Sequence, residues 1–310
     1  MELTTPVQQH FHFIGIGQNL LPDLAVALHQ LGHTVTGSDE VLPTRPLPAS
    51  VLPRVTGWFP DKINAEVDGI IVGPGISIDN PELIFGLQMG IPLYSFSGFI
   101  HHHARDQQRI VVAGSHSKTM IAAILCHVLK VLKRPFDYVL TTDIPGLTQR
   151  IRLSNAPIMI IESQDLLASI SNPIPMMHEF QHHVAVVPGI EWQPTATYPT
   201  KDLYIRHYHE FAAATPKGGA IIYFELDSVV AGLSPLNKVD VTYTPYKTHP
   251  SEIYQGKEFL ALPDKRRLSV KITGKHNYQN ISAALEVLKR VGVTSELFYN
   301  ALGQFEGLHN

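Results

Sequence analysis

The chain has one cysteine, Cys126, among its 310 residues, so it cannot form an intrachain disulfide. This composition suits a reducing compartment, and a cytoplasmic protein is expected. Charged residues are only 16% of the chain and the net charge is −3, which gives no electrostatic basis for binding nucleic acid or an anionic membrane. No apolar run is long enough to span a membrane, and the first residues lack the basic start and apolar run of a signal peptide.

Hydrophobic residues make up 44% of the chain, which is enough for packed cores in two domains of ordinary size. Segments with strand and helix patterns alternate along the chain, which predicts parallel sheets with helical crossovers. We therefore expect an α/β fold, with a Rossmann-like parallel-sheet domain at residues 1–104 followed by a P-loop ATPase-type α/β domain at residues 105–310. The strands are expected at residues 12–16, 34–37, 69–72, 91–94, 110–113, 158–161, 184–187 and 220–224, with an edge strand at 268–272. The helices are expected at residues 20–31, 81–89, 202–214, 280–291 and 295–305, and after the loop at 114–119.

A strand–loop–helix segment at residues 109–132 carries the strongest motif. An apolar run predicts a buried strand, the sequence GSHSKT follows, and apolar residues then recur at helical spacing. A tight loop here directs backbone N–H groups toward an anion, and the helix N-terminus adds partial positive charge. Lys118 fits the terminal phosphates of ATP, and the Thr119 hydroxyl fits Mg²⁺. The ATP-binding candidates in this loop are Gly114, Ser115, His116, Ser117, Lys118 and Thr119.

Glu162 ends the expected strand at 158–161, in the same domain as the loop. A carboxylate at the carboxyl end of a parallel strand is placed to hold Mg²⁺. We therefore take Thr119 and Glu162 as the metal-binding candidates, and Lys118 and Glu162 as the catalytic ones. A helix-capping or solvated acid is the alternative for Glu162, and Asp165 fits either role. The single thiol, Cys126, falls in the helix after the loop and is expected to be buried and inert.

The first domain has a glycine-rich turn of its own. Gly15 and Gly17 lie between a strand and a helix, and Asp39 follows the next strand. This resembles a dinucleotide-binding pattern in which an acidic side chain binds a ribose hydroxyl, but Leu20 stands where the third glycine would be. NAD, and a turn that binds nothing, remain alternatives. Another nucleotide, such as a UDP-sugar, is the preferred interpretation.

Histidines gather at residues 101–103, at 182–183 and at 207 and 209. Adjacent histidines on a helix point away from one another, and neither a cysteine nor a carboxylate completes a zinc-type set. We expect no metal at these positions, and we expect residues 101–103 to form a solvated linker. Another polar motif, GKHNYQN, precedes an amphipathic helix and places His276 and Asn280 on one face; taken alone, it predicts only an N-terminal cap.

Together, these segments resemble the Mur ligase family, most of all its murein peptide ligase branch, over essentially the whole chain. HFIGIG with VTGSD is similar to the first-domain pattern that holds the UDP-sugar, which implies that Gly15, Gly17, Ser38 and Asp39 contact uridine diphosphate. GSHSKT is similar to the ATP loop GTHGKT, and GKHNYQN to GxHNxxN, which implies that His276, Asn277 and Asn280 lie near the adenine. The resemblance implies ATP and Mg²⁺ as cofactors. It also implies a UDP-N-acetylmuramoyl substrate that is joined through an acyl phosphate to L-alanine or an L-alanyl peptide.

Several positions depart from the family pattern. Ser117 replaces the loop glycine, and if that position needs a positive φ the strain is about 1–2 kcal/mol. The family's Asp-His pair, whose histidine serves a second metal, is replaced by Gln193 and Pro194, and we expect the third ligase domain to be absent. These departures keep a second hypothesis open, in which the chain is a catalytically degenerate relative with a regulatory or scaffold role. Such a relative binds a nucleotide or a protein partner, or forms an oligomer. An NAD-dependent oxidoreductase is a weaker third reading, because it leaves the phosphate loop unexplained.

Overall fold

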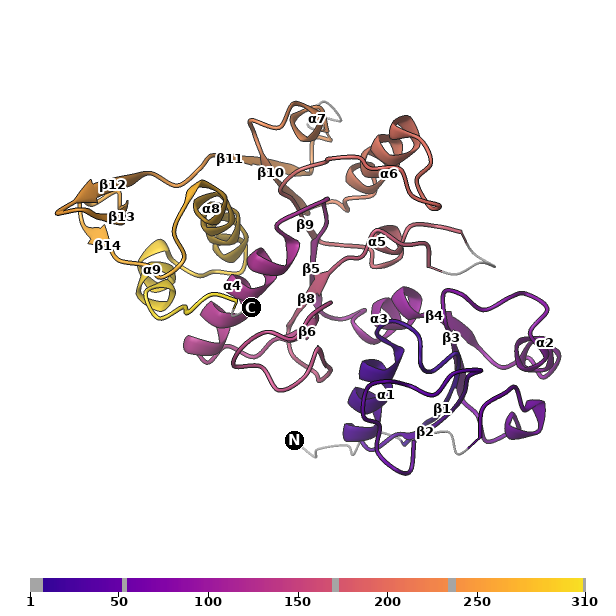
Figure 1. The fold of residues 1–310 in the computed structure, drawn as a ribbon. Helices are drawn as coiled ribbons and strands as arrows, with labels where there is room; N and C mark the ends of the chain where they lie inside the picture. The colour runs from indigo at the N-terminus through magenta and orange to yellow at the C-terminus, as the bar shows by residue number, and fades with distance from the viewer. Residues whose placement is uncertain (1–7, 52–54, 169–172, 234–237, 309–310) are drawn as a thin grey trace. The chain divides into compact units, whose positions relative to one another are not determined.

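The computed structural model describes residues 8–51, 55–168, 173–233 and 238–308. Figure 1 shows the chain as a ribbon with its helices and strands labelled. The chain divides into two compact units, each described separately below. The first unit is made of Met1–Arg105, Ile151–Ser154 and Leu166–Glu179, and the second of Asp106–Arg150, Asn155–Asp165 and Phe180–Asn310. Within the described residues, no helix is both long and apolar enough to cross a bilayer.

The first unit contains a four-stranded parallel sheet in the order β2-β1-β3-β4. These strands are β1 (His10–Ile14), β2 (Thr34–Ser38), β3 (Gly69–Val72) and β4 (Leu93–Ser95). Its other elements are α1 (Leu21–Gln30), η1 (Pro60–Lys62), α2 (Pro81–Gln88), α3 (Phe96–His103), β7 (Ile151–Arg152) and α5 (Met176–Glu179). Local sequence explains where α2 begins, because the Asn80 side chain accepts hydrogen bonds from the N–H groups of Glu82 and Leu83 and proline occupies the first turn.

Two predictions for this unit need correction. The histidines at 101–103 do not form a linker but complete the last turn of α3, whose start is capped by the side chain of Ser95. Of the three, His102 is exposed and the other two are half-buried. The strand expected at 91–94 is β4, which begins only at Leu93, because Ile91 and Pro92 lie between the turn after α2 and the strand.

The second unit is built on a sheet in which β11-β10-β9-β5-β8-β6 lie side by side, with parallel pairing throughout this run. Its strands are β5 (Gln108–Val112), β6 (Asp137–Val139), β8 (Ile158–Glu162), β9 (Val184–Val187), β10 (Ala220–Phe224) and β11 (Thr242–Tyr246). Its helices are α4 (Lys118–Val131), α6 (Lys201–Ala213), α7 (Ser228–Ala231), α8 (Lys275–Arg290) and α9 (Ser295–Leu302). The predicted α/β fold, with a parallel sheet in the first domain, is confirmed.

The predicted edge strand at 268–272 is wrong. Only the two-residue β14 (Arg267–Leu268) forms there, and it belongs to a separate antiparallel sheet with β12 (Ser251–Tyr254) and β13 (Lys257–Ala261). Val270 and Ile272 are buried in the core without strand pairing, so their apolar character comes from packing. A run of alternating apolar residues does not distinguish these two cases.

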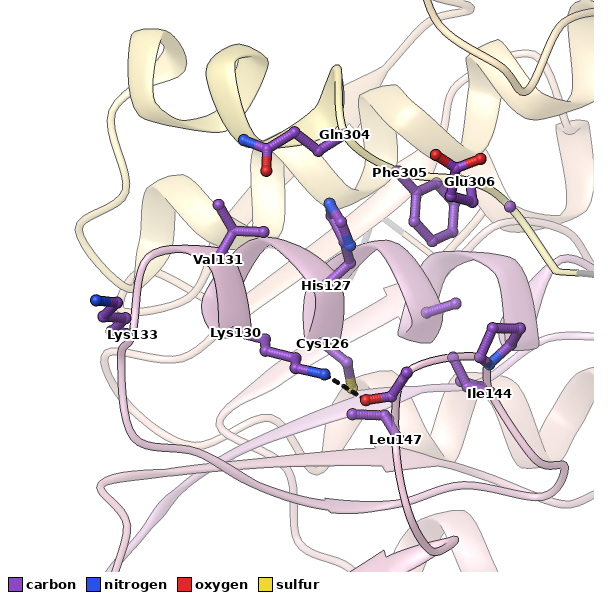
Figure 2. A pocket seen from close by; sticks show the side chains of 14 residues that line it. Cys126, His127, Lys130, Val131, Lys133, Ile144, Leu147, Gln304, Phe305 and Glu306 are labelled. Atoms are coloured by element: carbon purple, nitrogen blue, oxygen red, sulfur yellow. Dashed lines mark hydrogen bonds between the residues drawn. The ribbon is translucent and has the colours of Figure 1, made fainter.

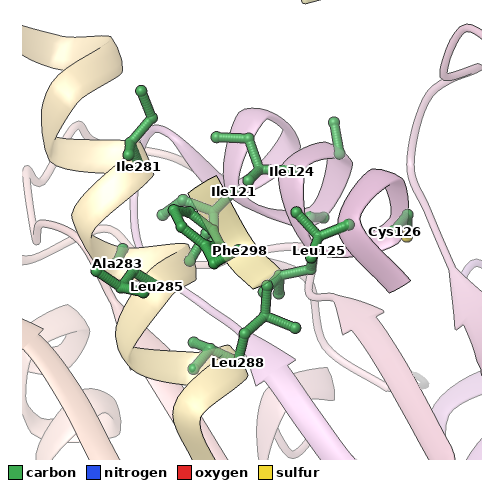
Figure 3. Packing of buried hydrophobic residues seen from close by; sticks show 14 of the residues in the cluster. Ile121, Ile124, Leu125, Cys126, Ile281, Ala283, Leu285, Leu288 and Phe298 are labelled. Carbon is green, nitrogen blue, oxygen red and sulfur yellow. The ribbon is translucent and has the colours of Figure 1, made fainter. Parts of the chain in front are cut away.

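The core of the second unit fixes α4, the helix that follows the phosphate loop. Ile121 and Leu125 recur on one face of α4 and pack in the same cluster as Ile281 and Leu288 of α8 and Phe298 of α9, as Figure 3 shows. All five are 0% exposed. Burying an aliphatic or aromatic side chain of this size stabilises a fold by about 1.5–3 kcal/mol. This packing holds the N-terminus of α4, and hence the loop before it, in a fixed place.

Candidate functional site

The loop at residues 114–119 connects β5 to α4 as predicted, and its backbone has the form of an anion site. Gly114 has φ +116°, and a Cβ there would lie 2.9 Å from the carbonyl oxygen of Gly189. The N–H of Ser115 donates to that same carbonyl over 3.0 Å. By contrast, the N–H groups of residues 116–120 have no hydrogen-bond partner among the residues that the structure describes. Unpaired N–H groups at a helix N-terminus are suited to bind phosphate.

Ser117 occupies a left-handed conformation, with φ +66° and ψ −8°. Because φ is positive, the Cβ of Ser117 strains the backbone, at a cost of about 1–2 kcal/mol relative to glycine. The serine hydroxyl lies 3.0 Å from Nδ1 of His116, and the His116 ring packs against Gly189. This contact ties the loop to the segment after β9.

Lys118 is held by a carboxylate of the same unit. Its Nζ donates to Oδ2 of Asp165 over 3.2 Å, and the two side chains are 16% and 30% exposed. The lysine charge is thus kept at the loop by a partner that a phosphate would have to replace. The sequence offered Asp165 for the same roles as Glu162. In the structure, its carboxylate pairs with Lys118.

Two tyrosines of α6 complete this network, and the sequence did not single them out. The Tyr208 hydroxyl accepts from the N–H of Gly114 over 3.0 Å and donates to Oδ1 of Asp165 over 3.2 Å. The Tyr204 hydroxyl donates to Oδ2 of Asp165 over 3.2 Å. Burial, followed by the charge of Asp165, raises the pKa of both phenols, so both keep their protons. The available signal was their spacing of four residues, which places two hydroxyls on one buried helix face.

Thr119 and Glu162 come together as the sequence predicts for a Mg²⁺ site. The Thr119 hydroxyl donates to Oε1 of Glu162 over 2.5 Å, and the N–H of Thr141 donates to Oε2 over 2.8 Å. Glu162 is 3% exposed, at the carboxyl end of β8. Each carboxylate oxygen keeps a further lone pair, and hydroxyl and carboxylate oxygens are the hard ligands that Mg²⁺ prefers. The described residues contain no group of three metal-ligating side chains, so a cation here would complete its shell with phosphate oxygens and water.

A small cavity of about 240 Å³ adjoins the loop, at the place where the resemblance puts the second metal. Gln193 lines it, together with Ser115, Asp165, Glu191, Thr195, Tyr198 and Tyr204. The Ser115 hydroxyl accepts a hydrogen bond from the N–H of Glu191, which fixes this wall against the loop. Gln193 offers one neutral amide oxygen and Pro194 offers no ligand, so the second metal of the family pattern has no equivalent set of donors here.

The glycine-rich turn of the first unit borders a separate cavity of about 330 Å³. Asp39 lines it and also accepts a hydrogen bond from the N–H of Gly17 over 2.8 Å, while Gly15 adopts φ +83°. Ser38 does not reach the cavity: it is fully buried, and its hydroxyl lies 3.5 Å from Nζ of Lys62. The described lining has three carboxylates, Asp39, Glu40 and Asp79, and no lysine or arginine. Such a lining suits hydroxyl and N–H donors of a nucleoside better than a diphosphate.

The GKHNYQN motif at the start of α8 has some residues at the surface and others in the core. His276 is exposed, and the Asn277 side chain donates to the carbonyl of Thr273 over 2.8 Å. Asn280 is 4% exposed, and its Oδ1 is buried without a hydrogen-bond partner in the described chain. A buried unpaired acceptor is costly unless a ligand satisfies it. This feature fits the adenine amino group that the resemblance assigns to the region.

One further histidine, His182, and the cysteine have structural surroundings. His182 is 2% exposed and lies 2.8 Å from the hydroxyl of Thr215. Cys126 is 1% exposed, and burial raises the pKa of its thiol far above the usual range, in line with the expected inert role.

A parallel sheet thus carries, at its carboxyl edge, a run of N–H groups, a lysine and a hydrogen-bonded threonine–glutamate pair, which is an arrangement suited to a phosphate group. No protein-family model matches the chain. Among curated proteins, it is 26% identical over 319 residues to the UDP-N-acetylmuramate–L-alanine ligase of Bordetella petrii, covering 97% of this chain and 66% of that protein. The enzyme of the same name from Agathobacter rectalis is 27% identical over 317 residues, covering 96% and 66%. The chain thus spans about two thirds of the length of these relatives.

Solved structures share the fold. The UDP-N-acetylmuramate:L-alanyl-gamma-D-glutamyl-meso-diaminopimelate ligase from Neisseria meningitides superposes with a TM-score of 0.81 at 19% identity, covering 98% of this chain and all of that one. The UDP-N-acetylmuramate–alanine ligase from Thermotoga maritima gives 0.71 at 19% identity, covering 97% and 70%. In sequence and fold, the chain is thus a relative of Mur ligases, and the names of the proteins it resembles include UDP-N-acetylmuramate.

Proposed function

We propose that the second unit binds Mg·ATP at residues 114–119 and that the first unit binds the nucleoside end of a UDP-N-acetylmuramoyl substrate. The observation that carries the proposal is the meeting of Lys118, the free N–H groups of residues 116–120 and the Thr119–Glu162 pair at one edge of the described sheet. The separate cavity at Asp39 supplies acceptors for ribose and base. Cytoplasmic peptidoglycan synthesis or recycling is the corresponding setting.

The reaction proposed is ligation of the muramoyl carboxylate to L-alanine or an L-alanyl peptide. In the first step a carboxylate oxygen bonds to the γ-phosphorus of ATP and ADP leaves, which gives an acyl phosphate. In the second step the amine attacks the acyl carbon, phosphate leaves, and the amine gives up its proton. Lys118 and the N–H groups of residues 116–120 neutralise charge on the transferred phosphoryl group. Thr119 and Glu162 would hold Mg²⁺, which supplies further charge neutralisation.

An assay of ADP release tests this proposal on the longest natural protein that carries the chain. The reaction contains Mg·ATP and UDP-N-acetylmuramate, with L-alanine or an L-alanyl tripeptide as the amine. ADP release that requires both the sugar nucleotide and an amine is expected, and Lys118→Ala should abolish it. Absence of any substrate-dependent ADP release would reject the ligase.

A second candidate is a degenerate relative that binds a nucleotide without completing ligation. Three features favour it: the strained Ser117, the absence of a histidine at Pro194, and the ion pair that occupies Lys118. In this case calorimetry detects Mg·ATP binding, but the assay above shows no turnover. The double variant Ser117→Gly with Pro194→His then separates the two candidates, because restored ATP hydrolysis indicates decay of an ancestral enzyme.

A further inference from the structure

A larger cavity, of about 530 Å³, lies at the other end of α4 from the phosphate loop (Figure 2). It is lined by the second half of α4, by residues 144–147 after β6, and by residues 304–307 after α9. Lys118 and Lys130 are twelve residues apart on α4, so the rise of the helix separates the two places by about 18 Å. The volume falls within the range of about 300–1,000 Å³ that is typical of small-molecule sites. This cavity is therefore distinct from both sites already described.

The walls of this cavity are apolar and held in place. Ile144 and Phe305 are at most 5% exposed, and Leu147 is half-buried at the opposite wall. The His127 ring lies 5.1 Å from the Phe305 ring, and its Nε2–H donates to the carbonyl of Ala301 over 3.0 Å. Figure 2 shows His127 and Phe305 on one side of the opening and Ile144 and Leu147 on the other. The cavity thus has a preformed shape that an apolar body can fill.

The charges at the rim are mainly positive. Lys130 reaches across the opening and donates a hydrogen bond from Nζ to the carbonyl of Gly146, drawn as the dashed line in Figure 2. Lys130 and Lys133 have no carboxylate partner among the described residues, whereas the lining carboxylate, Glu306, is already paired with Lys271. Gly146 itself has φ +83°, a conformation that favours glycine. An ammonium group at the opening of an apolar cavity, with a second lysine at its rim, complements an anion.

We propose that this cavity binds a small amphiphilic anion, an apolar body of aromatic or aliphatic carbon that carries one carboxylate, phosphate or sulfonate group. The apolar body lies between Phe305 and Leu147, and the acidic group reaches Lys130, with the charge of Lys133 farther along the rim. This site adds a ligand to the chain beyond nucleotide and sugar, and it stands whether or not the chain is a ligase.

A matched pair of fluorescent probes tests the site. The anionic probe 1-anilinonaphthalene-8-sulfonate and its neutral counterpart N-phenyl-1-naphthylamine share the same rings and differ in the sulfonate. One molecule of the anionic probe is expected to bind per chain. The double variant Lys130→Gln with Lys133→Gln should weaken the anionic probe at least tenfold and change the neutral probe less than twofold. Lys257→Gln with Lys265→Gln, on exposed positions of the β12–β14 sheet, is the matched control and should change neither.

Filling the cavity gives the complementary result. Leu147→Trp should abolish binding of both probes while the melting temperature shows that the chain is folded, and Val131→Trp is the second variant if the first does not fold. Lys118→Ala and added Mg·ATP should leave the anionic probe bound, whatever the outcome of the ligase assay. Equal loss of both probes in the lysine variant, undiminished binding in a folded tryptophan variant, or displacement by Mg·ATP would each overturn the proposal.

Discussion

The Thr119 hydroxyl donates a hydrogen bond to Oε1 of Glu162 over 2.5 Å, although 43 positions separate the two residues in the chain. Parallel pairing of β5 with β8 brings them together, because the loop after β5 and the last residue of β8 share the carboxyl edge of the sheet. Open parallel sheets generally bind ligands at this edge. The sheet topology therefore creates a pair of hard oxygen ligands out of two distant segments.

Glu162→Gln should weaken binding of Mg·ATP by about 10–100-fold. The amide keeps the shape of the side chain but loses the charge, and its NH₂ group opposes either the Thr119 hydroxyl or the Thr141 N–H, which both donate to Glu162. Calorimetric titration with ATP in the presence and absence of Mg²⁺ measures the effect. The loss should be confined to the titration with Mg²⁺, and Glu210→Gln on the exposed side of α6 serves as the control. Equal weakening without Mg²⁺ would speak against a metal at Glu162.

Ser117→Gly should make the chain more stable than Ser117→Ala by about 1 kcal/mol. Both variants lose the hydroxyl near His116, but only glycine relieves the cost of a Cβ at φ +66°. Urea unfolding of the two variants measures the difference directly, so the wild type is needed only as a reference. A stability equal in both variants would mean that the backbone at 117 relaxes to a negative φ in solution.

Tyr208→Phe should lower the affinity for ATP about tenfold and the free energy of unfolding by about 1–2 kcal/mol. The variant removes the acceptor of the Gly114 N–H and one of the donors to Asp165, and it leaves the aromatic packing of α6 unchanged. Tyr223→Phe, a half-buried tyrosine on β10, is the matched control. An unchanged affinity would show that the loop does not depend on α6.

A buried pair in the first unit gives a prediction for pH. Glu82 is fully buried, 3.3 Å from Nε2 of His12, and its Oε1 accepts from the N–H of Phe59 over 2.5 Å. Burial by itself would raise the pKa of Glu82, but the hydrogen bonds from His12, Phe59 and Ser38 outweigh it, and the pKa is lowered. A carboxyl whose pKa is lowered by folding adds stability above its unfolded value, near 4.5, and this stability is lost as the pH falls through the folded value.

Glu82→Gln should therefore lower the stability of the first unit by about 3 kcal/mol at pH 7, and the difference from the wild type should shrink below pH 4.5. Trp58 reports on this unit, and Trp192→Phe removes the only other tryptophan from the signal. Denaturant unfolding followed by tryptophan fluorescence gives the pH profile, with the exposed Asp61→Asn as the control. A deficit that stays constant from pH 7 to pH 3 would contradict the role of the ionised carboxyl.

The sequence predicted the parts of the fold and site that depend on local patterns. The apolar run before residue 114 and the helical spacing after it determine a strand–loop–helix, and Lys118 and Thr119 follow from the position of the loop. Glu162 was predicted from the sequence because it ends a buried strand, and parallel sheets place such residues at one edge. For Ser117, the missing glycine predicts strain only if φ is positive, and the structure has φ +66° there.

The features that escaped prediction depend on contacts between distant segments. Tyr208 is 94 positions from Gly114, and its spacing with Tyr204 indicates only a buried helix face. Asp165 was assigned no specific partner, because its link to Lys118 depends on how the loop after β8 folds back. Three adjacent histidines at 101–103 predict a polar linker. They are instead the end of α3, because the helix packs through the short apolar segment just before them. Sequence periodicity does not encode such contacts.

Titration of Mg·ATP into the wild type and into Lys118→Ala tests the central claim most directly, with the exposed Lys201→Ala as control. Charge-assisted hydrogen bonds from a lysine contribute about 1.5–3 kcal/mol each, and every 1.4 kcal/mol corresponds to a factor of about ten in affinity. One Mg·ATP per chain is expected in the wild type and in the control, and an affinity roughly 100-fold weaker is expected in Lys118→Ala. The absence of binding in the wild type, or equal affinity in Lys118→Ala, would contradict the claim.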